Sequence, residues 1–370
     1  MLKEKIKVLE LFGGIGAIRK ALINLDLDYE IVDYVEFDRK TVDAYNALYE
    51  DNRKVIDVRD YVIGDETKID LLFHGSPCQD FSVAGNNAGG ELGSDTRSSL
   101  LWETIRIVKN AKHLPKIIIW ENVKNVLSKK HKKVFDAYIE ELDKLGYLTS
   151  YKVINAANCG IPQNRNRVFT VSIYKDYVDD FESISSFECN EKMLPLKSFL
   201  EDDKSISQSY FIRNSIPSMI KAILNNKIKV VEDKCLTILT KQWRWNKQGV
   251  IKVPLYNFQQ ENFVFNKENN LVKVNTITAS GANSRQKLVV CVSDYETNNS
   301  DELAKFLIEG EQYYLRVITP LEALRLMGFS DSDYQKLNGF SKQQIYKMAG
   351  NSIVVKVLEK LVQHILKVNK

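Results

Sequence analysis

The sequence predicts an α/β fold, with a doubly wound, mostly parallel sheet in its N-terminal half and a second, smaller domain rich in β-strands and loops. Up to about residue 182, short β-branched apolar runs alternate with amphipathic helical patterns. Beyond that point, strand-like runs are separated by polar, Asn-rich turns without such alternation. The predicted domains are residues 1–182, completed by a C-terminal helix within about 345–370, and residues 183–344.

The strand candidates of the first domain follow one another at regular intervals. They cover residues 6–11, 29–35, 54–58, 69–73, 116–120, 151–155 and 168–173. The run 116–120 is nearly all apolar, which is typical of a strand buried on both faces. Helical patterns at 100–108 and 134–145 lie between the strands. Ligands of such a sheet bind at the carboxyl ends of its strands.

The second domain and the C-terminus show weaker patterns. Its strand candidates are residues 236–239, 250–253, 274–277 and 288–292. A closing helix is predicted over 352–368, where one apolar stripe must be buried. The stripe consists of Val354, Val355, Leu358, Val362 and Ile365. We expect it to pack on the first domain.

The length and composition of the chain limit the classes of protein to which it can belong. The chain has 370 residues, 44% of them hydrophobic and 27% charged, which is enough for two globular domains. No apolar run reaches the length of a signal peptide or a membrane span. The five dispersed cysteines include no CxxC pair, which argues against disulfides and against zinc. These features predict a cytoplasmic protein.

The charge is distributed unevenly. Residues 204–290 hold 14 Lys/Arg and 4 Asp/Glu, a net charge of +10, whereas the whole chain carries only +4. A basic segment in an otherwise acidic protein indicates a bound polyanion, although a solvated lysine-rich surface is an equal alternative. The interleaved aromatic residues favour nucleic acid. These are Tyr210, Phe211, Trp243, Trp245, Tyr256 and Phe258.

A glycine turn follows the first strand candidate. In Phe12-Gly13-Gly14-Ile15-Gly16 the glycines let the backbone pass close to a ligand, but Arg19 replaces the third glycine of a dinucleotide-binding fingerprint. Glu36 ends the second strand candidate 20 residues after Gly16, where an acid binds ribose hydroxyls. Asp57 ends the third strand candidate and either accepts from an adenine amine or caps a turn.

Three further segments carry chemistry. Cys78 lies between a strand candidate and a Gly/Ser/Asn-rich loop, a position typical of a nucleophile under a mobile loop. Glu121 follows a buried strand candidate, where it either donates a proton or starts a helix. Arg165 and Arg167 alternate, so in an extended chain they share a face and reach one pocket or phosphate, unless they are a surface pair.

In this order, the segments resemble the motifs of the DNA (cytosine-5)-methyltransferases of bacterial and phage restriction–modification systems. The matching elements are FGGIG, the strand-end acid, PCQxFS, ENV, PQNRxRVF, RVITPLEALRLMGF at 316–329 and AGNS at 349–352. The resemblance covers residues 6–173 and 313–358. It implies a Rossmann-like methyltransferase domain and a target-recognition domain. The family usually has alanine where this chain has Gly13, and we expect this change to be mild.

The resemblance also implies roles for individual residues. Cys78 would add to C6 of a flipped-out cytosine, Glu121 would bind its N3 and amine, and Arg167 would assist. Arg165 would anchor the loop or substrate. S-adenosylmethionine would be held by Phe12, Gly14, Gly16, Glu36, Asp57, Pro77, Leu100 and Asn351. DNA would be contacted by Gln79, Ser82, Arg97 and Arg244, the last a candidate base reader unless its flanking tryptophans are only core residues.

The predicted function is therefore methylation of C5 of cytosine in a specific duplex DNA sequence, by a monomer without membrane contact. The enzyme would belong to a restriction–modification system, with a cognate restriction endonuclease as functional partner, or be a solitary or phage enzyme. A transfer-RNA cytosine-5 methyltransferase is one rival, although its Cys-Phe-Thr element is missing. A non-catalytic DNA-binding relative is another, but such relatives lose Cys78 or Glu121. A dinucleotide oxidoreductase is a more distant alternative.

Overall fold

The computed structural model describes residues 5–77, 97–225, 227–240, 249–254, 289–291, 302–308 and 311–368. The chain forms two compact units. The first unit comprises Met1–Met193, Met327–Phe340 and Asn351–Lys370, and the second comprises Leu194–Leu326 and Ser341–Gly350. The roles predicted for the two domains remain predictions. Across the described ranges, no helix combines the length and the apolar character that a membrane crossing requires.

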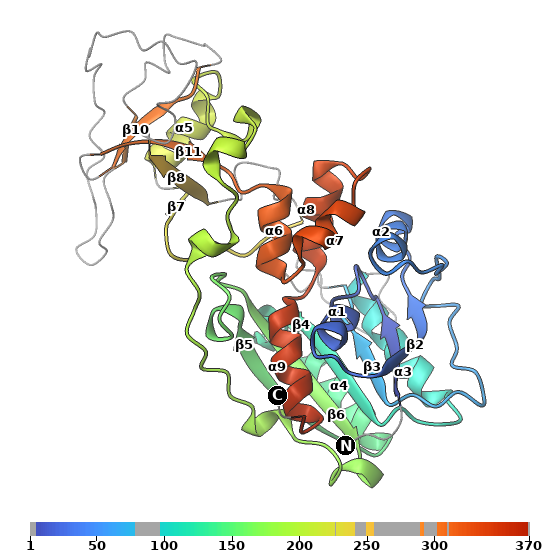
Figure 1. The fold of residues 1–370 in the computed structure, drawn as a ribbon. Coiled ribbons are helices and arrows are strands. Elements are labelled where there is room, and N and C mark those ends of the chain that lie inside the picture. Colours follow the sequence, from blue (N-terminus) through green and yellow to red (C-terminus); the bar gives the residue numbers. More distant parts are fainter. Residues whose placement is uncertain are drawn as a thin grey trace, which may run out of the picture. The chain divides into compact units, whose positions relative to one another are not determined.

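The first unit is built on a six-stranded sheet with the order β2-β1-β3-β4-β6-β5 (Figure 1). The strands are β1 (Ile6–Leu11), β2 (Tyr29–Val35), β3 (Leu71–His74), β4 (Ile117–Val123), β5 (Tyr147–Asn155) and β6 (Asn166–Tyr174). Strands β1 to β4 pair in parallel, while β6 runs antiparallel to both β4 and β5. The predicted α/β fold with a mixed, mostly parallel sheet is confirmed.

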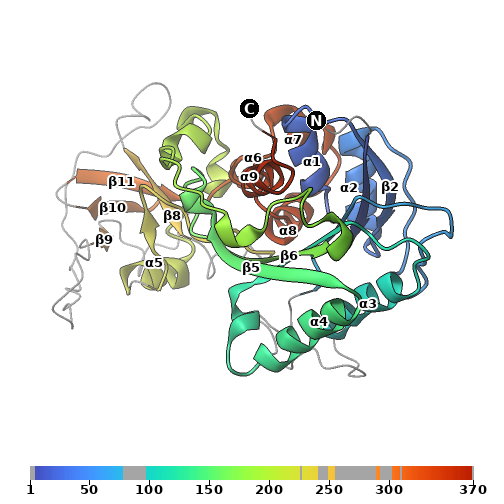
Figure 2. The same ribbon diagram turned by 90° about the horizontal axis from the view of Figure 1, so that it is seen from below.

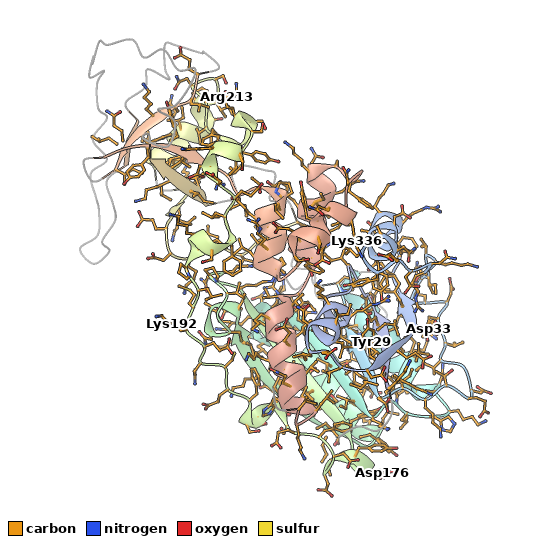
Figure 3. The ribbon with its side chains drawn as sticks, viewed as in Figure 1. Tyr29, Asp33, Asp176, Lys192, Arg213 and Lys336 are labelled. Carbon is orange, nitrogen blue, oxygen red and sulfur yellow. The ribbon has the colours of Figure 1, made fainter. Side chains whose placement is uncertain are left out.

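Helices cover both faces of this sheet. They are α1 (Ala17–Asn24), α2 (Arg39–Tyr49), α3 (Leu101–Lys109), α4 (Lys132–Lys144) and α9 (Val355–Ile365), while α7 (Asp331–Lys336) contacts α1 and α2. Figure 2 shows α3 and α4 on one face and α1 and α9 on the other. The apolar stripe predicted for the C-terminal helix is buried, and α9 packs against α1. Lys336 of α7, labelled in Figure 3, donates to the Leu48 carbonyl at 3.0 Å and so ties α7 to the end of α2.

The core of the first unit lies between β4 and the helices α3 and α4. Residues 117–122 of β4 are all buried, which confirms a strand enclosed on both faces. Trp120 stacks on Phe135 of α4 at 5.7 Å between ring centroids. The strand also extends three residues beyond its predicted end, so Glu121 lies within β4 and not after it.

The strand predicted at 54–58 is wrong. These residues form no strand. The Ile56 amide donates to the Glu36 carbonyl, just after β2, at 3.0 Å. β2 is the edge strand here, but the guanidinium of Arg53, and not the backbone of 54–58, donates to its Ile31 and Val32 carbonyls, at 2.8 and 3.4 Å. The apolar run is also only two residues long. Asp57 consequently lies in a turn, where it accepts from the Arg59 amide at 3.0 Å.

The second unit has a five-stranded sheet with the order β7-β8-β11-β10-β9. Its strands are β7 (Val230–Val231), β8 (Val250–Pro254), β9 (Val289–Cys291), β10 (Lys305–Ile308) and β11 (Glu311–Arg316). Its helices are α5 (Pro217–Leu224), α6 (Pro320–Met327) and α8 (Lys342–Asn351), of which α6 and α8 each end one residue inside the first unit. The strands predicted at 250–253 and 288–292 are confirmed as β8 and β9.

Other predictions for this unit fail or lie outside the described residues. The strand predicted at 236–239 is wrong, since these residues form no ladder. The strand predicted at 274–277 lies outside the described residues. The sequence reading missed β7, β10, β11, α5, α6 and α8. A proline at the first position of a helix was the available signal for α5, which begins at Pro217.

A buried ion pair joins β11 to α6 within the second unit. Arg316 and Glu322 both have fully buried side chains, and two guanidinium nitrogens donate to the two Glu322 oxygens at 2.8 and 2.9 Å. Arg316 Nε also donates to Asp203 at 3.0 Å. The Glu322 carboxylate further accepts from the amides of Thr319 and Glu201 at 2.8 and 2.9 Å. The pair therefore connects three separate segments of the unit.

Candidate active site

The carboxyl ends of four parallel strands align across the sheet of the first unit. Backbone pairing places four residues in one row, which are Val35, Leu11, His74 and Trp120. The next residue along each strand is, in the same order, Glu36, Phe12, Gly75 and Glu121. Because neighbouring strands lie about 4.8 Å apart, Glu36 and Glu121 are roughly 14 Å apart along this edge. The edge thus has two acidic ends with the glycine turn and the start of the Cys78 segment between them.

The glycine turn has left-handed backbone at three of its five residues. Phe12, Gly14 and Gly16 have φ values of 53°, 57° and 72°. An added Cβ at Gly14 would meet no atom within 4 Å, so the space beside this residue is open. At Gly16 it would lie 2.6 Å from the Tyr49 ring, which explains why only glycine fits.

Glu36 is held against this turn. Its Oε2 accepts from the Gly14 amide at 3.3 Å and its Oε1 from the Asp38 amide at 2.9 Å. Burial raises the pKa of the Glu36 carboxyl, while these amide donors oppose the rise. A carboxylate has about four lone-pair sites, so Glu36 can accept two further hydrogen bonds from a ligand.

The contacts of Arg19 show why this position is not the third glycine of a dinucleotide-binding fingerprint. Its guanidinium donates to Asp51 at 2.6 Å, to the Tyr45 hydroxyl at 3.1 Å and to the Tyr29 hydroxyl at 3.4 Å (Tyr29 is labelled in Figure 3). It also lies over the Tyr49 ring, 4.5 Å from the centroid. Arg19 therefore ties α1 to α2 and β2, a structural task that a glycine could not perform.

We predict that Gly13→Ala destabilises the protein by about 1–3 kcal/mol, because overpacking strains a filled core. An added Cβ would lie 2.6 Å from Tyr34, whose ring is buried and whose hydroxyl donates to the Gly14 carbonyl at 2.7 Å. The expectation of a mild change at this position is therefore revised. The measurement is the free energy of unfolding in urea.

Two variants control this prediction. Gly75→Ala should be nearly neutral in stability, since its Cβ would approach no atom closer than 3.8 Å. In a Tyr34→Val background, the loss caused by Gly13→Ala should largely disappear. An equal loss in both backgrounds would show that Tyr34 is not the cause.

Glu121 and Arg167 meet at the other end of the row. Glu121 pairs with Phe169 across β4 and β6, so Arg167, two residues from Phe169, is its diagonal neighbour on the same face. Arg167 Nε lies 2.9 Å from Glu121 Oε1, an ion pair whose angles fall outside those of a hydrogen bond. Burial raises the pKa of the Glu121 carboxyl, and the charges of Arg167 and Arg165 only partly oppose this. Glu121 is thus a buried acid that holds its proton more tightly than an exposed one.

Arg165 lies close to the same carboxyl but has a different task. Its side chain is buried and donates to the Ser352 carbonyl at 2.7 Å. This bond ties the β5–β6 connection to the segment just before α9. The charges of Arg165 and Arg167 thus both act on Glu121, a contact that the alternation of the two arginines did not itself predict.

Two residues missed by the sequence reading hold the backbone that leads to Cys78. Trp120 Nε1 donates to the buried Ser76 hydroxyl at 3.0 Å, and Asn122 Nδ2 donates to the Ser76 carbonyl at 3.3 Å. These bonds fasten the end of β3 to β4 beside Glu121. An amide and an indole within a buried strand were the available signal, because such groups need partners when buried.

The other predicted residues are placed as follows. Asp57 pairs with Arg59, which lowers the pKa of its carboxyl, and it lies outside the strand-end row. Pro77 is half-buried, Leu100 ends a 3-10 helix and packs on the core, and Asn351 is exposed at the end of α8. Arg97 begins the helix that Leu100 ends. Four of the predicted residues lie outside the described residues, namely Cys78, Gln79, Ser82 and Arg244. In the described part of the chain, no group of three His, Cys, Asp or Glu residues could hold a metal ion.

Comparisons with known proteins identify the family and the fold. A family model described as C-5 cytosine-specific DNA methylase matches residues 6–367. The orphan methyltransferase M.SssI of Spiroplasma monobiae is 30% identical over 429 residues, covering 98% of this chain and 97% of that protein. The orphan methyltransferase M.SPBetaI of Bacillus phage SPbeta is 27% identical over 438 residues, with 98% of each chain covered. In fold, the chain is similar to the Dnmt2 methyltransferase of S. pombe, with a TM-score of 0.66, 18% identity and 97% of each chain covered.

Proposed function

The chain belongs to the C-5 cytosine-specific DNA methylase family, and on this premise we propose that it methylates C5 of a flipped-out cytosine in a specific duplex DNA sequence, with Cys78 as nucleophile and Glu121 as acid. Methylation of cytosine in DNA is the general activity of this family. The observation that carries the residue assignment is the strand-end row. It places the buried carboxyl of Glu121, with Arg167 beside it, next to Gly75, three residues before Cys78.

S-adenosylmethionine is the methyl donor that membership of a methyltransferase family implies, and it supplies an electrophilic methyl group when bound. Residues of the glycine turn fit this cofactor. Glu36 retains acceptor capacity for a ribose diol, and the space beside Gly14 is open. Phe12 is half-buried at the same turn, where its ring offers an apolar face to adenine. Gly16, Asp57, Pro77, Leu100 and Asn351 are proposed to complete the site.

The chain's own residues would activate the base in two ways. Cytosine C5 is a poor nucleophile until a group adds to C6, and a thiolate adds and leaves readily. We therefore assign the addition to Cys78. Burial raises the pKa of Glu121 and so favours the protonated carboxyl, whose proton would go to N3 and neutralise the negative charge that develops on the ring.

The two arginines assist Glu121 but do not act as the proton donor. Arg167 adjoins Glu121 and favours the carboxylate that remains after proton transfer. Arg165 holds the β5–β6 connection through Ser352. Once the methyl group is on C5, loss of the C5 proton and β-elimination would release Cys78 and restore the aromatic ring. The target base must leave the stack for these groups to reach it.

Contacts to DNA are proposed for the residues flanking this site and for the basic segment. Gln79, Ser82 and Arg97 follow Cys78 along the chain, and Arg244 lies in the segment 204–290 with its net charge of +10. Lysine and arginine side chains there would bind phosphates, while Arg244 would read a base edge. A cognate restriction endonuclease and a monomeric state remain predictions.

A mechanism-based trap tests the proposed function. Bisulfite sequencing of DNA from cells that express the chain first identifies the methylated sequence. A duplex of that sequence with 5-fluorocytosine at the target should then form a covalent adduct with the wild-type protein in the presence of S-adenosylmethionine, because fluorine at C5 blocks the final elimination. Cys78→Ser should abolish the adduct.

Cys189→Ser is the matched control, since Cys189 is a half-buried free thiol in the first unit and should leave adduct formation intact. An adduct that persists in Cys78→Ser would contradict the assignment of the nucleophile. Methyl transfer to transfer RNA and not to duplex DNA would contradict the proposed substrate.

A further inference from the structure

A dense group of lysines follows β4 directly, outside the basic segment 204–290. Between Asn122 and Phe135 the sequence contains no Asp or Glu and five lysines, which we call the β4–α4 lysine patch: Lys124, Lys129, Lys130, Lys132 and Lys133. The residues outside 204–290 carry a net charge of −6 even with these five included. The charge of the patch is therefore opposite in sign to the net charge of the chain outside 204–290.

Most of the patch is exposed and electrostatically uncompensated. Lys124, Lys129, Lys130 and Lys133 are exposed, and Lys132 pairs with Asp136 of α4. Within the described part of the chain, no carboxylate lies at ion-pair distance from Lys124, Lys129 or Lys133. Like charges this close repel one another unless an anion lies among them.

Apart from Lys132, which pairs with Asp136, the patch does not serve the stability of α4. The first turn of this helix contains no acid and begins with Lys132 and Lys133, although cations at a helix N-terminus oppose the helix dipole. Two buried apolar side chains hold the segment in place. Val126 lies before most of the lysines and Phe135 after them, and both are fully buried. Between these anchors, the amides of His131 and Lys132 donate to the Ser128 carbonyl at 2.9 and 2.8 Å. The lysines are thus presented on an ordered turn.

The patch also lies at the edge of the sheet where the candidate active site is located. Lys124 follows Glu121 by three residues, so the two lie within about 11 Å along even a fully extended chain. α4 then starts from this edge and runs back along one face of the sheet (Figure 2). A duplex whose cytosine reaches Glu121 brings many phosphates near this edge, because DNA carries one per ~1.7 Å of its axis.

We propose that the β4–α4 lysine patch binds the phosphodiester backbone of duplex DNA flanking the flipped cytosine. This inference rests on the proposed function and adds to it a phosphate-binding surface in the first unit. Holding the backbone beside the target nucleotide resists its movement while the base rotates out of the stack. The contact is independent of base sequence, so it contributes affinity and not recognition.

The test is the salt dependence of DNA binding by the full chain. The triple variant Lys129→Gln/Lys130→Gln/Lys133→Gln is titrated by fluorescence anisotropy against a labelled duplex of random sequence, between about 50 and 200 mM salt. Each lost phosphate contact lowers the slope of log K against log salt by about 0.9, so we expect a slope reduced by about 2–3. Affinity at 0.1 M salt should fall at least about tenfold.

The control makes the same charge change at the opposite edge of the sheet. Lys5 and Lys68 precede β1 and β3, Lys175 follows the antiparallel β6, and all three are exposed. Lys5→Gln/Lys68→Gln/Lys175→Gln should retain the wild-type slope. Equal slopes for the two triple variants would overturn the proposal, whether both are reduced or neither is. Thermal unfolding of the patch variant should be unchanged or slightly higher, since three cations near a helix N-terminus are removed.

Failure of this proposal is distinguishable from failure of the proposed function. A wild-type protein that methylates DNA while the patch variant keeps its salt slope overturns only the patch. A wild-type protein that binds transfer RNA through the patch more tightly than duplex DNA overturns DNA as its partner. A wild-type protein that transfers no methyl group to any DNA contradicts the proposed function itself.

Discussion

Glu121→Gln is expected to lower the rate of methyl transfer by about 10²–10⁴-fold, the usual contribution of a positioned general acid. The amide keeps the shape of the side chain but has no acidic proton to give to N3. Its effect should appear in kcat, measured with saturating duplex and S-adenosylmethionine. The rate of adduct formation with 5-fluorocytosine should fall as well, since addition at C6 places charge on the ring that only a proton donor neutralises.

The pH dependence gives a second readout for the same group. Burial raises the pKa of Glu121 above its usual value, so the protonated acid persists to higher pH than in solution, and activity should decline as pH rises through this raised pKa. In Glu121→Gln this decline should vanish. Arg167→Met removes a charge that lowers the pKa, so the decline should move to higher pH.

A control separates acid catalysis from a loss of carboxylate charge. Glu66→Gln makes the same chemical change at an exposed residue ahead of β3 at the opposite edge of the sheet, where Glu66 pairs with Lys112. It should leave kcat unchanged. A Glu121→Gln variant that retains wild-type kcat and the wild-type pH profile would remove Glu121 from the mechanism.

Arg316→Met is expected to destabilise the protein by about 3–5 kcal/mol, because it leaves the buried Glu322 carboxylate without its cation. Glu322 would keep only the amide donors from Thr319 and Glu201. Loss of the guanidinium also removes the link to Asp203. The free energy of unfolding of the full chain in urea measures the effect. Limited proteolysis should show cleavage beginning in the second unit.

Two further variants serve as controls for the predicted loss of stability. Arg59→Met breaks an ion pair whose arginine is 64% exposed, and such pairs contribute at most about 1 kcal/mol. The double variant Arg316→Met/Glu322→Met removes both charges and should recover much of the lost stability, since a buried pair can often be replaced by apolar residues at little cost. A single variant as stable as Arg59→Met would show that the buried pair is not essential to the second unit.

Much of the first unit could be predicted from the sequence because its signals are local. The run 116–120 is apolar at every position but its first, Lys116, and this pattern alone indicates a strand buried on both faces. The glycine turn after 6–11 and the acid at the end of 29–35 follow from residue spacing. In a parallel sheet such strand ends converge, so Glu36 and Glu121 could be assigned to one edge without coordinates.

The second unit was less predictable because its elements are short and depend on distant partners. β10 and β11 begin with charged residues and form strands through pairing with each other, with β9 and with β8. The run 236–239 has strand-like composition but gains no partner strand. β-propensity describes fitness for a half-buried surface, and that surface exists only after the sheet has formed.

By itself, the sequence determined the fold class, the order of the motifs and the position of Glu36 at a strand end, because local composition and spacing encode them. Only the tertiary structure decided which groups meet. It placed Arg167 of an antiparallel strand against Glu121, set Tyr34 against Gly13, and used Arg19 as a tie between helices. The pKa of Glu121 arises from burial and from charges 44 and 46 residues away in the chain, which no local pattern contains.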